Sequence, residues 1–161
     1  MRGLAVVVAA ALTLAACADP RLKQNLAAAS AFLAANGKQA GVVTLPDGLQ
    51  YKVVTAGAAG GASPTPSQHV TVNYEGRLLS GQVFDSSYQR GEPATFQVGG
   101  LVPCWTEALQ RMKPGDIWML YCPPALGYGD KGAGPIAPGS ALVFKIELIA
   151  IQPDDASVGR G

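Results

Sequence analysis

The stretch HVTVNYEG, residues 69–76, decides the fold class of this chain. After the histidine, apolar and polar side chains alternate strictly. A period of two is typical of a β-strand with one face against a core and the other toward solvent. The apolar face carries Val70, Val72 and Tyr74, and the polar face carries Thr71, Asn73 and Glu75. The sequence therefore predicts a half-buried strand here, around which the rest of a sheet can be placed.

Other segments have strand character on both sides of this one. We predict strands over residues 49–55, 83–84, 95–98, 117–122 and 140–151, which are apolar or alternating. A stretch rich in glycine, serine and proline, residues 56–67, predicts a surface loop. The chain has 20 glycines and 12 prolines, as a fold with many tight turns requires. We expect consecutive hairpins that form a mainly antiparallel sheet.

One short helix is predicted between the strands. Apolar residues recur there at i, i+3, i+4 and i+7, namely Trp105, Ala108, Leu109 and Met112. Pro103 stands near its start, and Lys113-Pro114-Gly115-Asp116 ends it. A sheet packed on one short helix is an α+β arrangement.

A second helix is predicted ahead of the sheet, from Asp19-Pro20 to Asn36-Gly37. Its apolar stripe consists of Leu22, Leu26, Ala29 and Leu33, with Phe32 beside it. The stripe covers barely two heptads, which is too short for a convincing coiled coil. The alternatives are a helix packed on its own domain, a spacer or a dimer seam; we expect a spacer and a monomeric protein.

The first residues have the character of an export signal. Arg2 precedes the apolar run Leu4–Ala16, which is shorter than the roughly 20 residues of a membrane-spanning helix. The sequence Leu14-Ala15-Ala16-Cys17 resembles the lipobox of bacterial lipoproteins. The alternative is an ordinary secretory signal with an incidental cysteine.

These patterns divide the chain into four expected parts. They are a signal peptide over residues 1–16, a lipid-anchored helix or spacer over 17–43, the main domain over 44–152 and a disordered tail over 153–161. Cys17 is the expected lipidation site. We expect the protein to face the periplasm from the bacterial cell envelope, at the outer membrane, because no aspartate follows Cys17 directly.

Composition excludes several kinds of chemistry. A formal net charge of +1 offers no basic surface for nucleic acid, so no such partner is expected. His69 is the single histidine, and its place at the start of a strand argues against a catalytic triad or a zinc site. No phosphate-binding loop is present. We expect no metal and no cofactor.

Aromatic residues are spread over different predicted elements: Tyr74, Phe84, Phe96, Trp105, Tyr128 and Phe144. Periodicity alone cannot tell whether they line a pocket or form an ordinary core. Motifs add the missing information. Their blocks are LPDGLQY (45–51), VTVNYEG (70–76), VFDSS (83–87), LVPCWTEAL (101–109), LGYG (126–129) and IAP (136–138) leading into LVF (142–144).

In this order the blocks resemble the FKBP-type peptidyl-prolyl isomerases, in particular exported bacterial members similar to the macrophage infectivity potentiator proteins. The resemblance covers residues 44–152. It implies a twisted antiparallel sheet wrapped around the short helix, with an apolar pocket between them. It further implies cis/trans isomerisation of the bonds before proline in exported, incompletely folded proteins, with FKBP-directed macrolides as inhibitors.

The resemblance also implies roles for individual residues. Trp105 would form the pocket floor, and Tyr128 would offer its hydroxyl to a substrate carbonyl. Asp85 would be a polar anchor in the wall, although an exposed turn carboxylate is the alternative. Catalytic contacts are expected from Tyr74, Phe84, Asp85, Trp105, Tyr128 and Phe144, and substrate-binding contacts from Phe96, Leu101, Val102 (including its N–H) and Ile136.

Two questions stay open at the level of sequence. The domain could hold clients as a chaperone-like module with incidental isomerase activity, or more remotely serve as a structural spacer. Cys104 and Cys122 could form a disulfide in an exported compartment, or be two small buried side chains.

Overall fold

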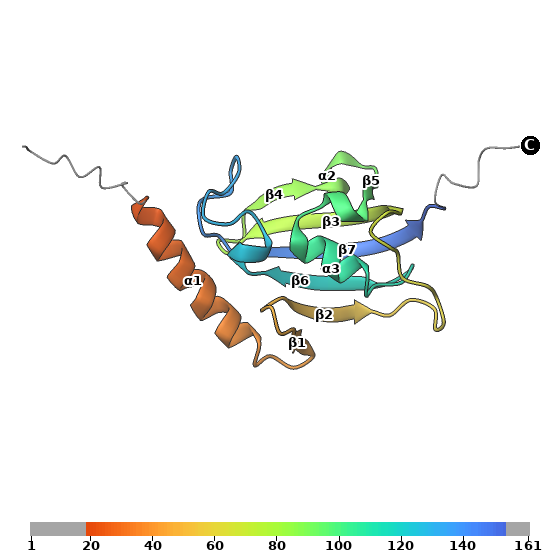
Figure 1. The fold of residues 1–161 in the computed structure, drawn as a ribbon, viewed down its shortest axis with the longest axis horizontal. Coiled ribbons are helices and arrows are strands. Elements are labelled where there is room, and N and C mark those ends of the chain that lie inside the picture. Colours follow the sequence, from red (N-terminus) through yellow and green to blue (C-terminus); the bar gives the residue numbers. More distant parts are fainter. Residues whose placement is uncertain (1–18, 154–161) are drawn as a thin grey trace, which may run out of the picture.

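A computed structural model describes residues 19–153, so the predicted signal peptide, Cys17 and the tail from residue 154 lie outside the described residues. Within residues 19–153 a seven-stranded antiparallel sheet has the order β1-β2-β6-β7-β3-β4, with β5 also paired to β3. Its strands are β1 (Val42–Thr44), β2 (Gln50–Thr55), β3 (His69–Leu78), β4 (Val83–Ser86), β5 (Ala94–Gln97), β6 (Ile117–Cys122) and β7 (Leu142–Ile151). The helix α3 (Pro103–Leu109) lies across one face (Figure 1). The α+β prediction is confirmed.

The two longest strands, β3 and β7, form the centre of the sheet. They pair from Val70–Ile151 to Leu78–Leu142. The alternating side chains predicted to face the core are buried in both strands, namely Val70, Val72 and Tyr74 in β3 and Leu142, Phe144, Ile146 and Leu148 in β7. Together with Leu109 of α3 and Leu120 of β6 they belong to one core cluster. This core supports the pocket described below.

The prediction of consecutive hairpins is wrong at β5. Both β4 and β5 pair with the same edge of β3, at Gly76–Asp85 and at Val70–Phe96 respectively. The short helix α2 (Ser87–Arg90), which was not predicted, lies between these two strands in the chain. Ser86 caps its start by accepting a hydrogen bond from the Gln89 N–H, and Gly91 ends it at a φ of 77°. The edge of the sheet is therefore one strand interrupted by a helical turn.

Smaller differences also concern short elements. β1 was not predicted, and neither were the 3₁₀ turns η1 (Val98–Gly100) and η2 (Pro124–Leu126). The predicted strand 95–98 ends one residue earlier, because Val98 begins η1. Met112, predicted as the last apolar position of the helix, lies beyond the end of α3 and is nevertheless fully buried in the core.

The N-terminal helix α1 (Pro20–Asn36) begins and ends where the sequence predicts. Of the alternatives for this helix, the structure shows packing on its own domain, in contact with the sheet. Ala29 is buried, and the Phe32 ring lies 6.1 Å from that of Tyr121 on β6. Gln50 of β2 donates a hydrogen bond to the Leu33 carbonyl at the end of the helix. In Figure 1, α1 crosses one end of the sheet.

Candidate active site

A pocket of about 400 Å³ lies between α3 and the strands β3, β4, β5 and β7. This volume is typical of sites for small ligands. Its lining consists of Tyr74, Phe84, Asp85, Phe96, Gly100, Leu101, Val102, Trp105, Tyr128 and Phe144. Ile136 is the predicted site residue that the structure does not place in this lining; it is buried and packs in the core cluster instead.

Trp105 forms the centre of the aromatic cluster. Three rings meet its indole edge-on, at centroid distances of 5.1 Å for Tyr74, 6.0 Å for Phe96 and 5.4 Å for Phe144. Phe84 in turn packs edge-on against Phe144 at 5.7 Å. Edge-to-face pairs stabilise their geometry by about 0.5–1.5 kcal/mol each beyond simple burial. The result is a cup of mutually fixed rings in which the indole is the common partner of Tyr74, Phe96 and Phe144.

Gly76 is a site residue that the sequence analysis did not single out. A Cβ atom built on it would lie 2.6 Å from Phe84 Cζ and 2.8 Å from Phe144 Cε1. Its backbone cannot retreat easily, because Gly76 is paired with Asp85 on one side and Phe144 on the other. The missing side chain thus lets two wall rings close over the strand. A glycine inside a strand is a sequence signal for such a close approach.

Replacing Gly76 by alanine is expected to push the Phe84 and Phe144 rings out of place. We expect the free energy of unfolding to fall by about 1–3 kcal/mol, because overpacking usually destabilises a protein by this amount. Isomerisation of an X-Pro peptide should slow with it. Denaturant unfolding and a peptide isomerisation assay would measure both effects. Arg77→Ala, an exposed change at the next position, serves as the control, and equal behaviour of the two variants would contradict the close-packing explanation.

Asp85 is held by a polar network at the rim of the pocket. Its carboxylate accepts hydrogen bonds from the Tyr74 hydroxyl at 2.5 Å and from the guanidinium of Arg90, which also donates to Tyr74 Oη at 2.9 Å. Burial raises the pKa of Asp85, but these hydrogen bonds and the charge of Arg90 outweigh it, and the net pKa is lowered. Burial raises the pKa of Tyr74. At neutral pH the carboxylate is ionised and the phenol keeps its proton.

The sequence left two interpretations of Asp85 open, a polar anchor in the pocket wall and an exposed turn carboxylate, and the structure has features of both. The Asp85 side chain is 43% exposed, yet it lines the pocket and is fixed from two sides. Arg90, which completes the network, was missed because it lies on the unpredicted helix α2. No periodic pattern marks a four-residue helix, so only tertiary structure brings Arg90 to Asp85.

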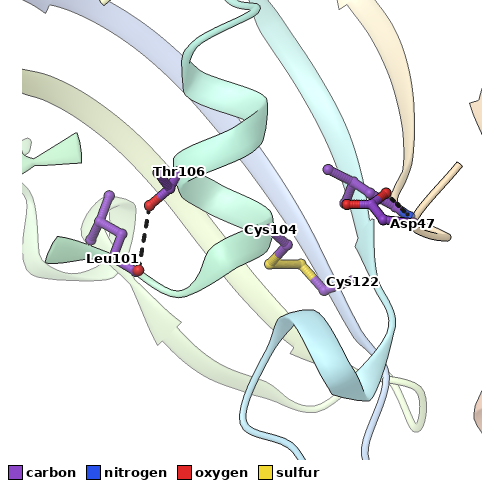
Figure 2. Close-up of a disulfide and its surroundings, with 6 residues drawn as sticks. Asp47, Leu101, Cys104, Thr106 and Cys122 are labelled. Atoms are coloured by element: carbon purple, nitrogen blue, oxygen red, sulfur yellow. Dashed lines mark hydrogen bonds between the residues drawn. A yellow bond between two sulfur atoms is a disulfide. The ribbon is translucent and has the colours of Figure 1, made fainter. Parts of the chain in front are cut away.

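Two groups at the pocket could donate hydrogen bonds to a ligand. Tyr128 follows η2, and its side chain is 39% exposed. The backbone N–H of Val102, which precedes α3, has no acceptor among residues 19–153. Thr106 of α3 fixes the segment before the helix. Its hydroxyl donates to the carbonyls of Val98 at 2.6 Å and Leu101 at 3.4 Å. Figure 2 shows the Thr106–Leu101 contact.

A disulfide joins Cys104 and Cys122, so of the two alternatives the structure contains the bonded one (Figure 2). The two Cα atoms are 5.9 Å apart, within the usual range for a disulfide. Both side chains are fully buried. The bond ties the residue directly before Trp105 to the end of β6, and six residues after Cys122 the chain reaches Tyr128.

Two further observations concern residues 19–153 alone. No cluster of three or more histidine, cysteine or acidic side chains in this range is arranged to hold a metal ion. None of the helices in the same range is long and apolar enough to cross a membrane.

An antiparallel sheet with one short helix across its face and an aromatic-lined pocket between them defines a structural class of small α+β domains. Comparison with known families identifies the class. The family described as FKBP-type peptidyl-prolyl cis-trans isomerase matches residues 60–149, and the domain described as amino terminal to it matches residues 6–53. The chain belongs to the FKBP-type peptidyl-prolyl cis-trans isomerase family.

Individual relatives agree with this assignment. The chain is 56% identical to peptidyl-prolyl cis-trans isomerase Mip of Coxiella burnetii over 129 residues, which cover 80% of this chain and 55% of that protein. It is 48% identical to outer membrane protein MIP of Legionella longbeachae, covering 83% and 57%. The crystal structure of FkpA from Escherichia coli matches with a TM-score of 0.80 at 42% identity, covering 83% of this chain and 62% of that one. The chain thus spans about half the length of the curated relatives it matches, from 42% to 58%.

Proposed function

We propose that this protein accelerates the cis/trans isomerisation of peptide bonds that precede proline. The observation that carries the proposal is the aromatic cup, a pocket of about 400 Å³ whose lining includes the buried indole of Trp105. A proline ring placed on the indole would be held between the edges of Phe84, Phe96 and Phe144.

The chemistry of the reaction suits such a site. Rotation must break the partial double bond of the amide, against a barrier of about 18–20 kcal/mol. The twisted amide is less dipolar than either planar form, so apolar walls disfavour the planar ground states more than the transition state. No nucleophile and no proton transfer are needed, and the reaction can proceed with Asp85 ionised and Tyr74 protonated.

The polar groups at the rim would position the flanking chain. The Tyr128 hydroxyl and the Val102 N–H are donors for substrate carbonyls. Asp85, fixed by Tyr74 and Arg90, places a negative charge at the edge of the pocket. Holding the chain in one orientation restricts its motion around the bond that rotates.

We further propose that the substrates are proline-containing, incompletely folded proteins exported from the cytoplasm. Support comes from the export-type leader, the lipobox-like sequence that ends at Cys17 and the similarity to a relative named as an outer membrane protein. In this proposal lipidated Cys17 anchors a monomeric protein to the cell envelope on the periplasmic side, at the outer membrane, and FKBP-directed macrolides occupy the cup as inhibitors.

The test is a peptide with one X-Pro bond, whose cis and trans forms are followed by NMR exchange spectroscopy. Catalytic amounts of the purified protein should accelerate the exchange, and an FKBP-directed macrolide should abolish the acceleration. Exchange at the uncatalysed rate would overturn the proposal. If an inactive protein still prevented aggregation of an unfolded client, the client-holding function would replace it.

A further inference from the structure

The loop that carries Tyr128 runs from the end of η2 to the start of β7 and is closed by its own hydrogen bonds. At its base the Gly139 N–H donates to the Gly129 carbonyl at 2.9 Å. Nearer the tip the Gly132 N–H donates to the carbonyl of Tyr128 itself at 3.1 Å. The position of the Tyr128 backbone therefore depends on where the returning limb, residues 137–140, is held.

The helix α1 contacts this returning limb directly. Asn25 donates a hydrogen bond from Nδ2 to the Pro138 carbonyl at 2.7 Å. Gly139 is buried beneath the helix, and a Cβ there would lie 2.9 Å from Leu22 Cδ1 and 3.1 Å from Leu26 Cγ. Gly139 also has a φ of 71°, which favours glycine. The helix and the limb thus approach as closely as a missing side chain allows.

Few other contacts hold this part of the helix. Among its residues only Ala29 is fully buried, and Leu26 remains 40% exposed. Three cavities border α1. One of about 220 Å³ lies next to Leu78 and Leu79, and one of about 370 Å³ lies next to Pro123 and Pro124. A third, of about 360 Å³, separates Arg21 from residues 133–138. A loosely packed helix transmits its position to the loop mainly through the Asn25 bond and the Gly139 contact.

We propose that α1 is a positioning element of the isomerase site and that Asn25 is its positioning residue. It acts through Pro138 and Gly139 on the base of the Tyr128 loop, and so on the hydroxyl that meets the substrate. The inference rests on the proposed function for its effect on catalysis. It assigns a role in the site to a helix that precedes the isomerase match at residues 60–149.

The experiment compares Asn25→Ala and Asn25→Asp with the wild type. Aspartate has nearly the same shape but offers an oxygen in place of the N–H donor. Both variants should raise KM for an X-Pro peptide about threefold to tenfold, the effect of losing one hydrogen bond, with kcat nearly unchanged. Hydrogen exchange at the Gly139 and Gly132 amides should accelerate by a similar factor, while amides of β3 and β7 keep their wild-type rates.

Matched variants separate positioning from general stability. Gln24→Ala removes a neighbouring amide on the exposed side of α1 and should match the wild type in KM and in exchange. Asn25→Gln keeps a donor and should recover part of the loss. Wild-type KM and loop exchange in Asn25→Ala, or equal acceleration at β3 and β7, would overturn the inference. An inactive wild type would instead overturn the proposed function, and the exchange rates would still test the contact.

Discussion

Replacing Trp105 by alanine is expected to lower kcat/KM for X-Pro isomerisation by at least about tenfold, a loss of about 1.4 kcal/mol of transition-state stabilisation. The substitution removes the common partner of Tyr74, Phe96 and Phe144. The three rings then lose their mutual orientation, and water can enter beneath the proline ring. The free energy of unfolding should fall by about 3–5 kcal/mol, as is usual when a buried aromatic is truncated.

The second tryptophan provides the matched control for this experiment. Trp118 on β6 is also buried, 5% exposed, and its ring stacks on Tyr51 at 4.2 Å, but it does not line the pocket. Trp118→Ala should cost comparable stability while kcat/KM of the folded protein stays near the wild-type value. Denaturant unfolding and the peptide assay measure the two quantities separately. Equal losses of activity in both variants would mean that general loosening, not the pocket floor, limits the reaction.

Prediction from sequence succeeded where a side-chain pattern reports burial directly. β3 and β7 each have one face against the core and one outside it, so their period of two is visible in the sequence. It failed for α2 and β1, which are too short to show any period. The pairing of β5 with β3 depends on the path of α2, which interrupts the edge between β4 and β5. That path is set by the tertiary structure and not by a local sequence pattern.

The same distinction applies to the site. The aromatic lining was predictable because ordered motifs mark its members, and the structure gathers them in one pocket around Trp105. Arg90, Gly76 and Asn25 carry no motif. Gly76 matters because it has no Cβ where the Phe84 and Phe144 rings lie. Asn25 matters because it donates a hydrogen bond to a carbonyl 113 positions away in the sequence. Ile136 lies in a matching block, but its side chain turns into the core.

Replacing Cys104 and Cys122 together by alanine is expected to lower the free energy of unfolding by about 3 kcal/mol. The bond closes a loop between residues 18 positions apart, and removing that constraint gives the unfolded chain additional conformational entropy of about this size. Both sulfurs are buried between α3 and β6, so solvent gains little access in the folded state. Urea unfolding of the variant and the oxidised wild type measures the difference.

Reduction of the wild type supplies an independent control for the disulfide prediction. A reductant strong enough to open the bond should shift the urea midpoint of the wild type toward that of the double variant, and leave the variant itself unchanged. Cys104→Ala alone should lose about as much stability as the pair, because either change removes the bond. A loss below about 1 kcal/mol would mean that packing between α3 and β6, with no contribution from the bond, holds the helix that carries Trp105 in place.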